Sequence, residues 1–125
     1  MVVGDLSDVE ADRVFQALAD TTRRDILVRS IEREQSVSAL ARGYEMSFAA
    51  VQKHVAVLER AGLITKQRHG REQIVQASAP TLRRAMALLD AYEQLWIQRA
   101  TQIAGILAGE EGAQHGGDHD QKGRG

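Results

Sequence analysis

The side chains best suited to specific recognition lie together between Ser47 and Lys53. Gln52 carries an amide, which can pair bidentately with adenine, and Lys53 carries a cation that can reach guanine. Ser47, Phe48 and Ala49 precede them, where helix N–H groups can meet a phosphate and an apolar group can touch a thymine methyl. These residues predict contacts with DNA bases and phosphates, although partial burial against the preceding turn would explain Phe48 equally well.

Such contacts require a helix whose opposite face packs against the protein. The apolar pattern predicts a helix of this kind over residues 47–60. Val51, Val55 and Leu58 recur at i, i+4 and i+7, which places them on the face opposite Gln52. Ser47 stands at the N-cap position, and Gly62 suits the left-handed residue that follows a helix end.

A shorter helix is predicted before it, opened by Ser36 or Ser38, with Val37, Leu40 and Ala41 as its apolar residues. A short helix, a turn and a longer helix with a polar outer face form a helix-turn-helix, whose second helix enters the DNA major groove. The second helix also contains His54, which is expected to contact a DNA phosphate or to have a structural role, and for which a metal-ligand role is the less favoured interpretation.

Two strands, over residues 63–67 and 73–76, are predicted to form a hairpin after the second helix. Gly70 suits the positive φ of a tight turn between them. Three basic side chains lie at the tip: Arg68, His69 and Arg71. We expect them to contact phosphate or the minor groove, which would make binding depend on salt; an exposed hairpin with idle charges is the alternative.

Two more helices are predicted before the helix-turn-helix. The first covers residues 7–18 and is expected to bury Val14, Phe15 and Leu18; the second covers residues 22–31 and is expected to bury Ile26, Leu27 and Ile31. A polar connector follows at residues 33–35. Arg23 and Arg24 fit two interpretations, contact with the DNA backbone or charge balance with Asp20 and Asp25.

The last predicted helix runs from about Pro80 to about Leu107. Its apolar residues recur every seven positions: Leu82, Leu89, Trp96 and Ile103. At about 40 Å this helix is longer than one small domain needs, and a sustained heptad pattern indicates pairing with a second subunit. A helix that wraps across its own domain is the alternative.

Composition limits the possible classes of protein. The length of 125 residues predicts one domain, placed over residues 1–108, and at 43% apolar but only 4% aromatic residues its core must consist of Leu, Ile, Val and Ala. A single proline and few strand-like runs favour a mainly helical fold. It has no cysteine, which excludes disulfides, thiol catalysis and cysteine-ligated zinc. No apolar run is long enough for a membrane span and no signal peptide is recognisable, so a cytoplasmic location is expected.

The distribution of charge favours nucleic acid although the net charge is −1. Between Ser47 and Arg71 there are five basic side chains and one acidic side chain, whereas acidic residues gather near the two ends of the chain. Binding depends on the local potential, so this asymmetry matters more than the net value. The sequence contains no phosphate-binding loop, no recognisable nucleophile site and no plausible pair of catalytic carboxylates, so it gives no indication of an enzyme.

Residues 109–125 are rich in glycine and charge, and a disordered tail is predicted there. The tail carries side chains that could ligate a metal: His115, Asp118, His119 and Asp120. Ordering a flexible segment costs entropy, so only weak binding is expected, and we predict no metal or other cofactor.

Two segments together resemble the arsenic-repressor (ArsR/SmtB) family of bacterial winged-helix transcription regulators. The first is ALADTTRRDIL at residues 17–27, and the second is the spacing S-x-x-x-V-x-x-H-V-x-x-L-x-x-A-G-L at residues 47–63. Gly70-Arg71 of the hairpin matches as well, and the resemblance covers about residues 9–107.

The resemblance implies a winged helix-turn-helix of order α-α-α-α-β-β-α and a homodimer joined through its first and last helices, with Phe15 on the first. It also implies two recognition helices about 34 Å apart on an inverted-repeat operator. The family's metal sites use cysteines on the short helix, or Asp and His on the last helix. Residues 36–42 have no cysteine and residues 80–107 no histidine, so neither metal site is supported and the effector is unknown.

The sequence therefore predicts a transcriptional regulator, most plausibly a homodimeric repressor of its own or another promoter. A winged-helix module that binds another protein is the alternative, which an exposed Phe48 would favour and the local positive charge opposes.

Overall fold

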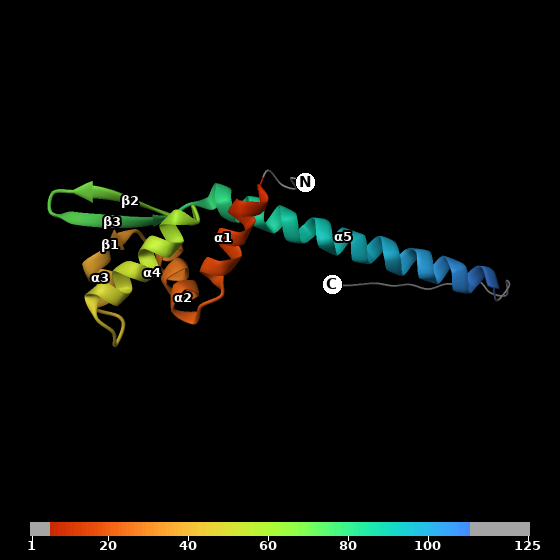
Figure 1. Ribbon diagram of the computed structural model, residues 1–125, viewed down its shortest axis with the longest axis horizontal. Coiled ribbons are helices and arrows are strands. Elements are labelled where there is room, and N and C mark those ends of the chain that lie inside the picture. The colour runs from red at the N-terminus through yellow and green to blue at the C-terminus, as the bar shows by residue number, and fades with distance from the viewer. Residues whose placement is uncertain (1–5, 111–125) are drawn as a thin grey trace. The chain divides into compact units, whose positions relative to one another are not determined.

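Five helices and three short strands make up residues 6–110, the part of the chain that the computed structural model describes (Figure 1). In chain order they are α1 (Asp8–Leu18), α2 (Thr21–Glu32), β1 (Gln35–Ser36), α3 (Val37–Ala41), α4 (Phe48–Arg60), β2 (Ile64–His69), β3 (Glu72–Ala77) and α5 (Ala79–Glu110). The chain divides into two units, residues 1–89 and residues 90–125. The mainly helical fold with a small β-hairpin is confirmed.

Helices α3 and α4 form the predicted helix-turn-helix, and both begin at a capping serine. The Ser36 hydroxyl accepts a hydrogen bond from the Ala39 N–H at 3.0 Å, and the Ser47 hydroxyl accepts one from the Ala50 N–H at 3.0 Å. Each bond satisfies an amide that the first helical turn leaves without a partner. The apolar residues expected on the inner faces are buried: Val37, Leu40, Val51, Val55 and Leu58.

The hairpin is longer than predicted and belongs to a three-stranded antiparallel sheet of order β1-β3-β2. Strand β2 pairs with β3 from Ile64 opposite Ala77 to His69 opposite Glu72, and Gly70 turns the chain at a φ of 63°. The sequence analysis missed β1: it placed Gln35 in a connector, whereas Gln35 pairs with Val75 of β3. A two-residue strand has no periodicity of its own, so pairing alone defines it.

The core of the first unit lies between α1, α2, α4 and the sheet, with Ile26 and Leu27 of α2 in it. The prediction that Phe15 and Ile31 are buried in the core is wrong. Phe15 is 36% exposed and Ile31 is 56% exposed. On α1 the buried residues are Val14 and Ala17, three apart, so the buried stripe of the helix turns away from the bulkier Phe15.

The first turns of α5 belong to the same core. Thr81, Ala85 and Leu88 are buried, and Thr81 Oγ1 lies beside Gly62. Gly62 follows α4 with a φ of 80°, as the predicted helix stop requires. Leu82 is only half-buried and Leu89 is exposed, so the heptad residues lie off the face that this core buries.

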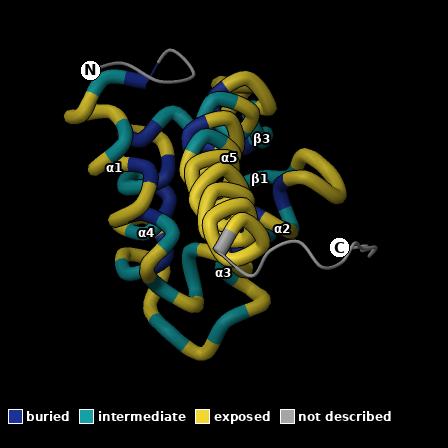
Figure 2. The backbone as a smooth tube through the Cα atoms, turned by 90° about the vertical axis from the view of Figure 1, so that its right-hand side faces the viewer, coloured by how far each residue is buried: buried dark blue, intermediate teal, exposed yellow. Residues whose placement is uncertain are grey.

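From Asp90 onward α5 forms the described part of the second unit. All its residues from Tyr92 to Gly109 are exposed, as the continuous exposed colour along the helix shows (Figure 2). The helix ends at Glu110, three residues beyond the predicted end at Leu107, so the predicted domain boundary after residue 108 falls inside it. Apart from residues 109 and 110, the predicted tail with its four candidate metal ligands lies outside the described residues.

Candidate nucleic-acid interface

The outer face of α4 presents the four side chains predicted to read bases. Phe48, Ala49, Gln52 and Lys53 are all exposed, at positions i, i+1, i+4 and i+5, which share one side of a helix. The inner side is closed by fully buried valine and leucine. The buried face therefore anchors α4 to the core, and the exposed face is accessible to a partner. Phe48 is 46% exposed, so part of its ring faces solvent and part is covered, which fits both DNA contact and partial burial against the preceding turn.

The start of α4 offers two amide groups to an anion. The Ser47 cap satisfies the Ala50 N–H, and the Val51 N–H bonds to the Ser47 carbonyl at 3.1 Å. The N–H groups of Phe48 and Ala49 have no protein acceptor within residues 6–110. Amides of this kind, at the positive end of a helix dipole, suit a phosphate oxygen.

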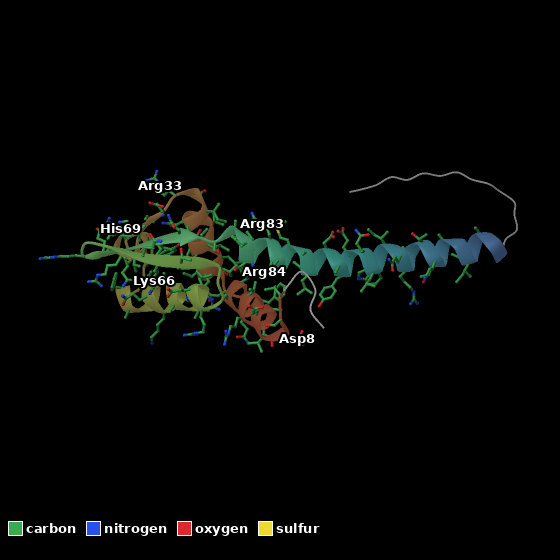
Figure 3. All side chains as sticks on the ribbon, turned by 90° about the horizontal axis from the view of Figure 1, so that it is seen from above. Asp8, Arg33, Lys66, His69, Arg83 and Arg84 are labelled. Carbon is green, nitrogen blue, oxygen red and sulfur yellow. The ribbon has the colours of Figure 1, made fainter. Side chains whose placement is uncertain are left out.

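The hairpin tip places the predicted basic side chains in solvent. Arg68, His69 and Arg71 are exposed, and successive residues of a strand point to opposite faces. Arg68 therefore shares a face with Lys66, while His69 points to the other face (Figure 3). Lys66 forms an ion pair within the protein, because its Nζ lies 3.4 Å from Glu59 Oε1. This ion pair joins β2 to the last turn of α4.

Arg23 is brought to α4, but its guanidinium is engaged inside the protein. Its Nε donates to the Ala17 carbonyl at 2.8 Å and one Nη donates to the Gln16 carbonyl at 2.9 Å. The other Nη lies 3.4 Å from His54 Nδ1. The carbonyl end of α1 is the negative end of its dipole, which favours a cation there. Arg23 thus links α1 to the middle of α4.

Asp20 completes this network. Its carboxylate caps α2 by accepting the Arg23 N–H at 2.9 Å, and the same oxygen lies 3.8 Å from His54 Nδ1. The backbone hydrogen bond, helped by the nearby His54 and Arg23, lowers the pKa of the Asp20 carboxyl. Arg24 donates to the Leu18 carbonyl at 2.8 Å and does not pair with Asp25, so the charge-balance interpretation does not describe this arginine.

A second cluster braces the turn that precedes α4. Tyr44 Oη donates to Asp25 Oδ2 at 2.5 Å, and the Arg29 guanidinium stacks 4.8 Å from the centre of the Tyr44 ring. Burial, together with the bond to Asp25, raises the pKa of the Tyr44 hydroxyl, which keeps it a donor. Gly43 leaves room for Arg29, because a Cβ there would overlap the guanidinium. The turn is thus tied to α2.

One basic residue of this surface was counted in the charge pattern but not assigned to the site. Arg60 is exposed in the last turn of α4, seven residues after Lys53, a spacing of nearly two helical turns. This spacing places Arg60 on the same side of α4 as Lys53, and it could have assigned Arg60 to the site from the sequence. Asp8, at the acidic start of α1, lies at the opposite end of the first unit from His69 of the hairpin (Figure 3).

Within residues 6–110 no three His, Cys, Asp or Glu side chains are grouped as a metal site would need. Among these residues, no helix has the length and apolar character that would cross a bilayer.

Comparison with known proteins gives regulators of transcription. No family model matches the chain. It is 33% identical over 99 residues to the HTH-type transcriptional regulator Rv2034 of Mycobacterium tuberculosis, covering 79% of this chain and 90% of the relative. The structure resembles an ArsR-like transcriptional regulator from Rhodococcus sp. RHA1 with a TM-score of 0.71 and 33% identity, covering 78% of this chain and 92% of that one.

A further structural relative is the homodimeric winged helix-turn-helix DNA-binding domain of Mb0332 from Mycobacterium bovis, a possible ArsR-family regulator. It has a TM-score of 0.56 and 26% identity, and the match covers 72% of this chain and 91% of that one.

Proposed function

Because the chain belongs to the ArsR family of helix-turn-helix transcriptional regulators, we propose that it is a homodimeric repressor that binds an inverted-repeat operator in double-stranded DNA. The observation that carries this proposal is the division of α4 into a fully buried apolar face and an exposed face that carries Phe48, Ala49, the Gln52 amide and the Lys53 cation. Such a face can enter a major groove without exposing the core.

Each side chain that the sequence predicted to contact DNA has a place in this proposal. Base edges are read by Phe48, Ala49, Gln52 and Lys53, and the DNA backbone is held by Ser47, Arg68, His69 and Arg71. For Arg23 and His54 the contact between them supports a role in fixing α4 against α1, and direct phosphate contact is the alternative. No catalytic residue and no cofactor enters this function.

The second subunit is proposed to pair through α1 and α5. Exposed apolar side chains mark both helices: Phe15 on α1, and Leu89, Trp96 and Ile103 on α5, in line with the half-buried Leu82. That the Mb0332 domain is homodimeric supports the pairing of two copies. We propose residues 1–108 as the DNA-binding and dimerisation domain, with two copies of α4 about 34 Å apart, one turn of DNA.

The test measures fluorescence anisotropy of the purified chain on labelled DNA from the region upstream of its own gene, with a scrambled duplex of equal composition. We expect tighter binding to the upstream DNA and an affinity that falls steeply with salt. Arg68→Gln should lower the slope of log affinity against log salt by about one, as loss of one phosphate contact predicts. Arg33→Gln, which removes an exposed cation at the end of α2, is the matched control and should leave the slope unchanged.

Equal affinity for both duplexes would reject an operator upstream of the chain's own gene. Binding that does not respond to salt would reject the groove model altogether. It would direct attention to the protein-binding alternative, for which the exposed Phe48 is the best anchor.

A further inference from the structure

A hollow of about 500 Å³ lies in the first unit, away from the outer face of α4. Its walls come from the last turns of α2, the end of β3 and the start of α5. Leu27, Ile31 and Leu82 form its apolar part, and Glu34 and Gln76 its polar side. The volume falls within the range of small-molecule sites, which are mostly apolar with a few placed polar groups.

The polar side of this hollow carries a single charge. Glu34 is the one ionisable residue of the lining, and it is exposed. Its carboxylate accepts a hydrogen bond from the Gln76 side-chain amide, and no cation of residues 6–110 pairs with it. Ser30 and Ser78 add hydroxyl groups but no charge, and the Ser30 hydroxyl already donates its proton to the Ile26 carbonyl at 2.8 Å. An occupant that matches these walls carries one positive charge on an apolar body.

We propose that this hollow binds a small organic cation, an ammonium or amidinium on an aromatic or aliphatic body. The charged group would meet the Glu34 carboxylate, and the body would cover Leu27, Ile31 and Leu82. Ile31 is 56% exposed, so its coverage would remove apolar surface from water, which favours binding. A charged hydrogen bond to Glu34 is stronger than the neutral amide that it would replace.

Glu34 is also connected to the helix-turn-helix, which gives the site a regulatory consequence. The residues directly after it form β1, in which Ser36 pairs with Ile74 and also caps α3. The bond from Gln76 to Glu34 therefore holds the α2–α3 connection against the strand that forms the wing. A cation that takes Glu34 from Gln76 loosens this link. This consequence rests on the proposed DNA-binding function, whereas the site itself does not.

The binding test uses three probes with one body and different head groups: 4-phenylbutylammonium, 4-phenylbutanol and 4-phenylbutyrate. Isothermal titration calorimetry on the full-length chain without DNA should give the ammonium at least about tenfold higher affinity than the other two. Glu34→Gln keeps a hydrogen-bond partner for Gln76 but should abolish the preference. Glu32→Gln, the same change at an exposed α2 residue outside the lining, should retain it.

Equal affinity for the three probes, or a preference that survives Glu34→Gln, would overturn the proposal. Failure of all probes to bind would also overturn it. If Ile31→Glu then converts a dimer to a monomer in sedimentation, the hollow belongs to the subunit interface. Chemical-shift changes on probe binding that leave residues 27–34 and 76–82 unaffected would place the probe elsewhere and count against the site.

A separate measurement tests the regulatory consequence. At saturating 4-phenylbutylammonium the dissociation constant for the upstream DNA should rise at least about threefold, and Glu34→Gln should remove this response. A constant that does not change, with probe binding established by calorimetry, would reject the coupling and leave the site. If no specific DNA binding is found, the calorimetry still decides the site on its own.

Discussion

Helix α4 and the part of α5 beyond Asp90 have opposite surfaces. In α4 the apolar residues Val51, Val55 and Leu58 are buried in the chain's own core, and the exposed residues are small or polar except for Phe48. In α5 beyond Asp90 every described residue except Ala91 is exposed, and large apolar side chains recur along it: Leu95, Trp96, Ile97, Ile103, Ile106 and Leu107. The same chain thus leaves two chemically different surfaces uncovered.

The difference indicates which partner each surface needs. A polar, cationic face loses little in water and gains from phosphates and base edges, so it suits DNA. A long apolar helix surface is costly to leave in water, and contiguous apolar patches mark protein interfaces. The heptad spacing makes a second copy of the same helix the natural partner.

The largest effect should come from the buried side of α4. Leu58→Ala is expected to lower the free energy of unfolding by about 2–5 kcal/mol, because Leu58 is fully buried and its loss leaves a cavity. Urea denaturation at several protein concentrations measures it. The loss of unfolding free energy in Leu58→Ala should not vary with protein concentration, because Leu58 packs within one chain. The loss in Leu95→Ala should vary with protein concentration, because α5 is expected to pair with a second chain. If both variants behaved alike, the two helices would not differ as described.

The next effect is expected at the apolar surface of α5. Trp96 is 75% exposed in the single chain, so Trp96→Glu should leave the monomer folded but weaken dimerisation by about 2–4 kcal/mol, as for an interface hot spot. Light scattering over a dilution series gives the mass. Thr101→Glu adds the same charge about 140° around the helix and should remain dimeric. An unchanged dimer mass for Trp96→Glu would refute this role for the stripe.

A smaller and more selective effect is expected on the outer face of α4. Gln52→Ala should cost about 1–3 kcal/mol on the operator and much less on non-specific DNA, since a base-edge contact is lost. Competition binding against both duplexes separates these values. Equal losses on the two duplexes would reassign Gln52 to the DNA backbone.

The smallest effect concerns how α4 is held. Hydrogen bonding in the native state lowers the pKa of Asp20 below its ordinary 3.8, so the unfolded chain binds more protons in that range. The stabilisation is therefore fully present above about pH 4 and is lost as the pH falls through the lower native pKa. Denaturation between pH 3 and pH 6 should show a shallower loss for Asp20→Asn than for the unaltered chain. If stability varied with pH in the same way for both proteins, Asp20 would not contribute to the pH dependence of stability.

The elements that sequence predicted well are those with local signals. Ser36, Ser47 and Gly62 fix helix ends through neighbours within four residues, and the i, i+4, i+7 pattern of α4 fixes its buried face. Phe15 and Ile31 were misassigned because residue type alone does not decide which of two adjacent positions faces the core: Val14 is buried beside Phe15, and the polar Ser30 is buried beside Ile31.

Parts of the candidate site depended on contacts between distant residues. The bond of Arg23 to the α1 carbonyls and its approach to His54 join residues up to 31 positions apart, which no local pattern reveals. The exposed positions of Gln52 and Lys53, in contrast, followed directly from the buried face of the same helix.

The sequence by itself determined the helices, the hairpin and the polar face of α4, because caps, glycine turns and apolar periodicity act within a few residues. Tertiary structure alone decided β1, the engagement of Arg23, the hollow beside Glu34 and which residues of α5 the core covers. These depend on which surfaces meet after the chain has folded, and pairing across 40 residues, as between Gln35 and Val75, has no local signature.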